Sequence, residues 1–119
     1  MDEGRPLFQQ IAEQIESSIL DGTLAADAQV PSTNELAAFH RINPATAAKG
    51  VSQLVTDGIL YKKRGIGMFV ASDARRRVLD RRRDAFARDF VEPLLAEARR
   101  LGLSAADVRD LIEKWGEGR

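Results

Sequence analysis

The stretch NPATAAKGVSQLVTDG, residues 43–58, predicts a helix with both of its ends marked in the sequence. Asn43 can cap the first free N–H groups, and Pro44 suits the first helical position, where its missing N–H costs nothing. Gly58 suits the left-handed residue that often follows the end of a helix. We therefore expect a helix with boundaries close to these residues.

This predicted helix has one apolar face and one small polar face. The apolar face carries Ala47, Val51, Leu54 and Val55. The opposite face carries Ala45, Lys49, Ser52, Gln53 and Thr56. Because the outward side chains near the N-terminus are short, the backbone can approach a DNA groove, and the helix dipole favours phosphate contacts. A helix that only faces solvent can look the same, so the flanking sequence has to distinguish the two interpretations.

Upstream, two further patterns predict helices. Between Pro6 and Gly22, apolar residues recur at three- and four-residue spacing, so we expect a helix that forms one wall of the core. Ser32 and Glu35 have the spacing of a capping box, which predicts a short helix that starts there. The inward side chains of this short helix are expected to be Leu36, Ala37 and Phe39.

The short helix and the 43–58 helix are separated only by residues 40–42. Two helices joined by so short a turn, the second with a polar outward face, predict a helix-turn-helix. Gly50 lies in the middle of the second helix, at a cost of about 1 kcal/mol relative to Ala. We expect that this glycine allows the preceding helix to approach closely.

A β-hairpin with a basic tip is predicted directly after these helices. Residues 59–63, ILYKK, and 68–70, MFV, have strand character, and RGIG at 64–67 is a tight turn. Three consecutive cations occupy positions 62–64, and the glycines on both sides of Ile66 allow the tip to enter a narrow groove or lie along phosphates. A hairpin that only faces solvent would have similar turn glycines. Helix-turn-helix followed by a basic hairpin, however, is the order of a winged helix.

The sequence VPSTNELAAFHRINPATAAKGVSQLVTDGILYKKRGIGMFV, residues 30–70, resembles the DNA-binding domain of GntR-type bacterial transcription regulators. The resemblance covers roughly residues 6–71, and INPATAAK with the short helical tail is similar to the YtrA-like subfamily in particular. It implies DNA contacts from the start of the second helix, the start and exposed face of the third, and the wing tip. Carried onto this sequence, those positions are Ser32, Asn34, Ala45, Thr46, Lys49, Lys63, Arg64, Gly65 and Gly67.

Two positions depart from the family pattern. GntR-type regulators usually have Arg where this chain has Asn34, and often another Arg where it has Pro44 and Ala45. A missing bidentate Arg–guanine contact is worth about 1–3 kcal/mol, so binding is expected to be weaker or to have a different sequence preference. Lys49 becomes the leading cation of the recognition helix.

Composition excludes several other classes of protein. The chain has 119 residues and 44% hydrophobic content, enough for one domain, or for one small domain plus an appendage, with a compact core. It has no cysteine, which excludes disulfides, thiolate metal sites and thiol catalysis. The polar, acidic N-terminus MDEGRPLFQQ does not resemble a signal peptide, and no apolar run approaches a membrane span, so we expect a cytoplasmic protein with no membrane partner.

The net charge is zero, but it is unevenly distributed. Residues 1–72 carry six Lys or Arg and eight Asp or Glu, whereas residues 73–119 carry twelve and ten. DNA binding must therefore depend on a few placed cations and have a modest salt dependence. The runs at 75–77 and 81–83 are interleaved with Asp80 and Asp84, so we expect a solvated, ion-paired helix face there.

Residues 73–119 predict a helical tail. Apolar residues repeat along 73–101, and Pro93 is expected to cause a kink or a restart near Glu92. After Gly102, the pair Ser104 and Asp107 predicts the cap of a further helix, whose buried face is expected to contain Val108, Leu111, Ile112 and Trp115.

Two helices of this size cannot bury their apolar faces against each other alone. We therefore expect the tail to pair with its copy in a second chain, so that two recognition helices meet half-sites about 34 Å apart on an inverted repeat. The expected interface residues are Leu79, Phe86, Phe90, Leu94, Leu101, Leu111 and Trp115. A fragment that ends at Ser72 is expected to fold as a monomer.

The expected fold class is mainly α with a small β-hairpin: a winged helix-turn-helix domain at 1–72 plus a C-terminal helical dimerisation appendage at 73–119. The expected function is sequence-specific operator binding by a homodimeric repressor, and the YtrA-like resemblance implies control of a transporter operon and of its own gene.

His40 is the only imidazole and no catalytic constellation is present, so neither an enzyme nor a cofactor is expected. A winged helix that binds proteins is the alternative; the three cations favour DNA. An effector is neither indicated nor identified.

Overall fold

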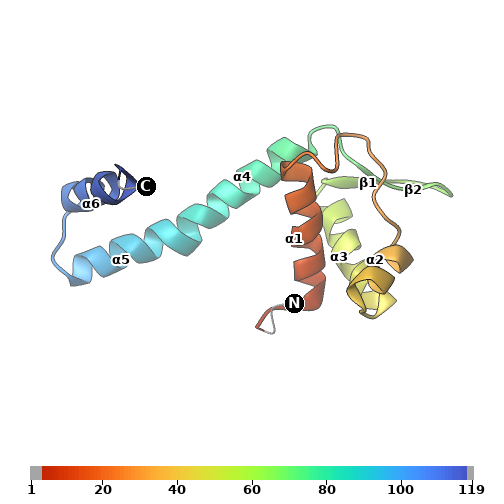
Figure 1. Ribbon diagram of the computed structural model, residues 1–119, viewed down its shortest axis with the longest axis horizontal. Helices are drawn as coiled ribbons and strands as arrows, with labels where there is room; N and C mark the ends of the chain where they lie inside the picture. Colours follow the sequence, from red (N-terminus) through yellow and green to blue (C-terminus); the bar gives the residue numbers. More distant parts are fainter. Residues whose placement is uncertain (1–3, 118–119) are drawn as a thin grey trace. The chain divides into compact units, whose positions relative to one another are not determined.

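The computed structural model of the protein describes residues 4–117, which are mainly helical with one two-stranded antiparallel sheet (Figure 1). The elements in chain order are α1 (Leu7–Leu20), α2 (Thr33–His40), α3 (Pro44–Thr56), β1 (Leu60–Lys63), β2 (Gly67–Val70), α4 (Ala74–Phe86), the π-helical turn η1 (Ala87–Val91), α5 (Glu92–Arg100) and α6 (Ala105–Glu117). This confirms the expected fold class of a helical protein with a small β-hairpin.

The chain forms two compact units, Met1–Asp80 and Arg81–Arg119. The division lies within α4 and therefore further along the chain than the expected boundary after residue 72. Ala74 and Val78, on the first turns of α4, are 1% and 0% exposed and belong to the core of the first unit. The start of α4 is thus part of the winged-helix core.

The core of the first unit is formed by α1, α2, α3, the hairpin and the start of α4. Its largest fully buried side chains are Ile11, Val51, Leu54, Ile59, Leu60, Val70 and Val78. Full burial of an aliphatic side chain of this size contributes roughly 1.5–3 kcal/mol. The predicted apolar face of α3 is confirmed for Ala47, Val51 and Leu54, and Val55 is half-buried at its edge.

The local signals for α3 are present as predicted. The Asn43 side-chain oxygen accepts a hydrogen bond from the Ala45 N–H at 2.7 Å, and Pro44 is the first helical residue. The helix ends at Thr56, and Gly58 has a φ of +75° in the turn to β1. Both ends of α3 are therefore encoded by residues at those ends.

Two expectations about packing are wrong. Phe39 was expected to point inward but is 82% exposed, because α2 contacts the core through Leu36 and Ala37. The Phe39 ring instead borders an open groove between α1 and α2 and meets the His40 ring edge-on at 4.9 Å. Gly50 faces α1 rather than the preceding helix α2, since a Cβ there would lie 2.6 Å from the carbonyl oxygen of Phe8.

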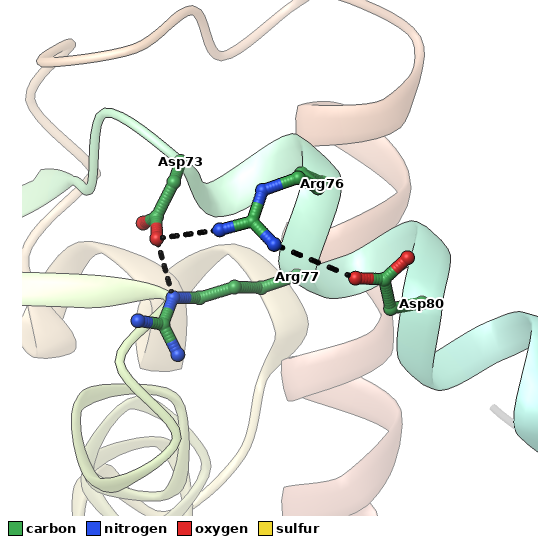
Figure 2. Close-up of polar contacts among 4 residues, drawn as sticks. All are labelled: Asp73, Arg76, Arg77 and Asp80. Atoms are coloured by element: carbon green, nitrogen blue, oxygen red, sulfur yellow. Dashed lines mark hydrogen bonds and ion pairs between the residues drawn. The ribbon is translucent and has the colours of Figure 1, made fainter.

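Ion pairs join the turn before α4 to its first two turns (Figure 2). The Asp73 carboxylate accepts from Arg77 Nε at 2.8 Å and pairs with Arg76 at 3.4 Å, and Arg76 also reaches Asp80 at 3.7 Å. The Arg77 hydrogen bond holds the pKa of Asp73 below its ordinary value. The Arg77 guanidinium also lies 3.4 Å from the position of a Cβ on Gly58. For Arg76 and Arg77, the expected ion-paired helix face is confirmed.

In the second unit, the helical chain changes form before Pro93. The turn η1 is π-helical, and the Glu92 N–H donates to the Ala87 carbonyl five residues back. Pro93 lacks an N–H and its ring would crowd the carbonyl four residues earlier, which an α-helical turn cannot accommodate without distortion. The expected restart at Glu92 is present, because α5 begins there.

Helix α6 begins with the predicted cap. The Ser104 hydroxyl accepts from the Asp107 N–H at 3.1 Å, and the Ser104 N–H donates to the Asp107 carboxylate at 2.9 Å. The bond from the Ser104 N–H, followed by the Ser104 hydroxyl, lowers the pKa of Asp107. Within residues 4–117, no helix is both long enough and apolar enough to span a membrane.

Candidate nucleic-acid interface

The first group of predicted contact residues lies at the start of α2. The Ser32 hydroxyl accepts from the Glu35 N–H, and the Ser32 N–H donates to the Glu35 carboxylate, both at 3.1 Å. The Ser32 N–H, followed by the Ser32 hydroxyl, lowers the pKa of Glu35, because hydrogen bonds to the carboxylate favour its charged form. The Ser32 side chain is exposed at this helix start, where a hydroxyl can contact a phosphate oxygen. Asn34 is exposed in the first turn of α2.

The second group lies at the start and on the outward face of α3. Ala45 is exposed and Thr46 is half-buried, so the first turn presents short side chains as predicted. Lys49 is exposed one turn later, and its ammonium nitrogen lies 4.1 Å from the centroid of the Phe8 ring on α1. The aromatic face attracts the cation and thereby orients the lysine side chain.

The third group is the wing, which comprises β1, the turn and β2 (residues 60–70); we call residues 63–67 the wing tip. Lys63 pairs with Gly67 in the strand register, and the Ile66 N–H closes the turn by donating to the Lys63 carbonyl at 2.9 Å. Gly65 has a φ of +76°, which favours glycine at this position. Arg64 is exposed at the turn.

The wing lysine is also held over an aromatic ring. Lys63 Nζ lies 4.6 Å from the centroid of the Phe69 ring, and Phe69 stacks on Tyr61 with centroids 5.8 Å apart. The Tyr61 hydroxyl donates to the Asp27 carboxylate at 2.9 Å, which raises the pKa of Tyr61. Figure 1 shows the hairpin extending away from the helices of the first unit, with its turn at the far end.

The structure therefore places the predicted residues in three groups: the start of α2, the first turns of α3, and the wing tip. Two further residues beside these groups were not predicted from the sequence. Ile66 is 64% exposed at the wing tip, and Gln29 contacts the wing from the segment before α2. Ile66 could have been chosen from its position between two glycines, whereas no local pattern marks Gln29.

The residues predicted for the dimer interface are mostly exposed within this chain. Leu79 is half-buried, and Phe86, Phe90, Leu101 and Trp115 are 59–67% exposed. Of the expected inner face of α6, Val108 is buried within the chain, while Leu111, Ile112 and Trp115 are exposed. The second unit has a groove of about 360 Å³, lined by Leu94, Ala98, Leu101, Val108, Leu111 and Trp115 among others.

The sequence matches relatives along nearly its whole length. The HTH-type transcriptional regulator YhcF of Bacillus subtilis is 29% identical over 114 residues, which cover 96% of this chain and 93% of YhcF. The HTH-type transcriptional repressor YtrA of the same organism is 24% identical over 109 residues, which cover 92% of this chain and 83% of YtrA. Both relatives are named as transcription regulators, not as enzymes.

Solved structures have the same fold. A GntR family transcriptional regulator from Listeria monocytogenes aligns over 96% of this chain and 98% of its own, with a TM-score of 0.75 and 28% identity. The DNA-binding domain of AraR, solved in complex with the operator ORX1, aligns over 60% of this chain and 87% of its own, with a TM-score of 0.55 and 35% identity.

The sequence model described as "Bacterial regulatory proteins, gntR family" matches residues 7–70, the range from the start of α1 to the end of β2. More than half of the chain therefore carries this family's DNA-binding domain. The protein belongs to the gntR family of bacterial regulatory proteins and is a transcription regulator.

Proposed function

We propose that the protein is a repressor that binds an inverted-repeat operator as a homodimer through its C-terminal helices, in the cytoplasm. The observation that carries the proposal is the exposure of short polar and cationic side chains at α2, α3 and the wing tip, in a fold that AraR uses on operator DNA. Repression follows from occupancy, since a dimer bound over a promoter blocks polymerase.

The proposed contacts divide by chemistry. Lys49, Lys63 and Arg64 neutralise phosphates or read base edges, and Ser32 and Asn34 add hydrogen bonds. Ala45 and Thr46 allow α3 to approach the major groove, and Gly65 and Gly67 keep the wing tip narrow. In this proposal the first unit, up to Asp80, binds DNA, because the start of α4 belongs to its core, and the helices beyond Asp80 serve dimerisation.

The proposed dimer would bury the exposed apolar side chains of the second unit against the same side chains of a second copy. Five large apolar side chains that are more than half exposed in so short a segment favour burial in an interface. A two-fold dimer also matches the two-fold symmetry of an inverted repeat. From the similarity to YtrA, we further propose that the controlled genes include a transporter operon and the regulator's own gene.

The DNA contacts are tested with Lys49→Ala and Arg64→Ala, measured by fluorescence anisotropy over a salt series on a fragment selected from the organism's genome. Each variant should lose affinity severalfold and reduce the slope of log K against log salt by about 1. Arg109→Ala, an exposed cation on α6, is the matched control. If both variants bind within about twofold of the wild type with unchanged slopes, these contacts are wrong. The genes beside the selected fragments test the operon assignment.

The dimer is tested by sedimentation of Phe90→Asp beside Phe39→Asp, two exposed phenylalanines given the same change. Phe90 lies in the proposed interface, so its variant should sediment as a monomer at micromolar concentration while Phe39→Asp stays dimeric. Dissociation by Phe39→Asp alone would place the interface on the first unit.

A further inference from the structure

The segment before α2 lies along the free edge of the wing. The Val30 N–H donates to the Met68 carbonyl at 2.9 Å, and the Val70 N–H donates to the Ala28 carbonyl at 2.9 Å. Gln29 forms a β-bridge with Phe69 between these two bonds. The segment thus acts as a short third strand, and it continues directly to the Ser32 cap of α2.

The side chain of Gln29 reaches from this segment to the wing tip. Its amide Nε2 donates to the Ile66 carbonyl at 3.1 Å, across 37 positions of sequence. The same nitrogen lies 2.7 Å from the position of a Cβ on Gly67, where φ is +147°. The amide therefore occupies the space that any larger residue at 67 would fill.

This bond acts on the one part of the wing that the strand ladder does not hold. The β1–β2 pairing ends at Lys63 and Gly67, and inside the turn the Ile66 N–H bonds the Lys63 carbonyl. The Ile66 carbonyl receives its hydrogen bond from Gln29, outside the hairpin. A turn held by this hydrogen bond loses less conformational entropy when it binds DNA than a turn that moves freely.

We propose that Gln29 is a positioning residue for DNA recognition, which holds the wing tip and so sets the direction of Arg64 relative to the start of α2. The inference rests on the proposed function, because it requires the wing tip to contact DNA. Gln29 acts through the turn and needs no contact with DNA itself. Its loss should weaken operator binding about threefold to tenfold, the range expected for one net hydrogen bond.

The test is a double-mutant cycle in the full-length protein, on the genomic fragment selected as above. Gln29→Met keeps the length and neutrality of the side chain and removes the donor. It is measured in the wild-type and in the Arg64→Ala background, with Gln9→Met on the exposed side of α1 as the matched control. Gln29→Asn, whose amide is one methylene short of the turn, should behave like Gln29→Met.

The expected result is a threefold to tenfold loss with Gln29→Met that falls below twofold in the Arg64→Ala background, because the two residues act through one contact. The urea midpoint should fall only slightly, by what one exposed hydrogen bond contributes, and the amide resonances of Gly65 and Gly67 should show increased motion. Gln9→Met should change none of these quantities.

Equal losses in both backgrounds would overturn the proposal, since Gln29 would then act independently of the wing tip. No loss with Gln29→Met, while Arg64→Ala weakens binding, would overturn this inference and leave the proposed function intact. No loss with Arg64→Ala itself would reject the wing contact of the proposed function, and the role of Gln29 with it.

Discussion

At the scale of single residues, Gly50 shows how one missing side chain sets the distance between two helices. The carbonyl oxygen of Phe8 occupies the space where a Cβ would lie, and Ile11 atoms are 3.3–3.4 Å from the same point. The contact brings α1 against the recognition helix, so the position of α3 depends on a residue with no side chain.

We expect Gly50→Ala to destabilise the protein by about 1–2 kcal/mol in urea denaturation. Overpacking lowers the free energy of unfolding by roughly 1–3 kcal/mol, and the better helix propensity of Ala offsets up to about 1 kcal/mol of this loss. Gly116→Ala on α6 is the matched control, since its Cβ would meet nothing within 4 Å. A Gly50→Ala protein as stable as the wild type would contradict the close contact between α1 and α3.

Asp73 makes the stability of the fold depend on pH. Its folded-state pKa is depressed by the hydrogen bond from Arg77, so the interaction stabilises the fold above the ordinary Asp pKa of about 3.9 and is lost as the pH falls through the lower folded value. Asp73→Asn should therefore be less stable than the wild type at pH 7, and the difference in urea midpoint should shrink between pH 5 and pH 3. Asp110→Asn, on the exposed face of α6, should show no such convergence.

At the scale of elements, α2 depends on its cap more than the other helices do. It has eight residues, too few to be stable alone, and it buries only Leu36 and Ala37. The reciprocal bonds between Ser32 and Glu35 give the backbone N–H groups of both residues a side-chain acceptor at the start of the helix. The cap therefore contributes a large share of what holds this helix in place.

Ser32→Ala should lower the unfolding free energy by about 1 kcal/mol, because the Glu35 N–H loses its acceptor. Ser52→Ala, in the middle of α3 and exposed, should be neutral or slightly stabilising, since Ala is the better helix former. Both are measured by urea denaturation at one protein concentration. Equal effects of the two substitutions would mean that the cap contributes nothing.

The π-helical turn explains why the apolar side chains of the tail line up. An i to i+5 turn takes up one more residue than an α-helical turn, so side chains four residues apart fall closer to one line along the axis. Phe86 and Phe90 have this spacing, and their ring centroids are 5.6 Å apart. Pro93, which favours the turn, thereby also supports the apolar stripe proposed for the dimer.

At the scale of the whole molecule, the winged-helix core extends beyond the hairpin. Ala74 and Val78 are buried in it, although both were expected to belong to the tail. A fragment that ends at Ser72 loses both side chains and the Asp73–Arg77 pair. A fragment that ends at Asp80 keeps them.

We therefore expect the 1–80 fragment to fold as a monomer and the 1–72 fragment to be less stable by at least about 1.5–3 kcal/mol, the burial energy of one Val. Urea denaturation measures the difference, and sedimentation gives the oligomeric state. Equal stability of the two fragments would remove α4 from the core. A dimeric 1–80 fragment would contradict the proposed tail interface.

Much of the fold and of the candidate site could be predicted because its signals are local. Asn43, Pro44 and Gly58 mark α3 through hydrogen bonds and φ values within a few residues, and the capping box at Ser32 does the same for α2. The hairpin register follows from its turn glycines. Sequence by itself was sufficient to predict helix ends and turns, because residues nearby in the sequence form the hydrogen bonds of the backbone groups there.

Tertiary structure alone determined which surfaces meet. Elements far along the chain determine the exposure of Phe39, the contact of Gly50 with α1 and the burial of Val78. Apolar periodicity predicts a buried face but does not indicate which element covers it. Gln29 is the clearest case, since its amide finds a carbonyl 37 positions away. Local sequence determines helix ends and turns, whereas contacts between residues far apart in the sequence are determined only when the whole chain packs.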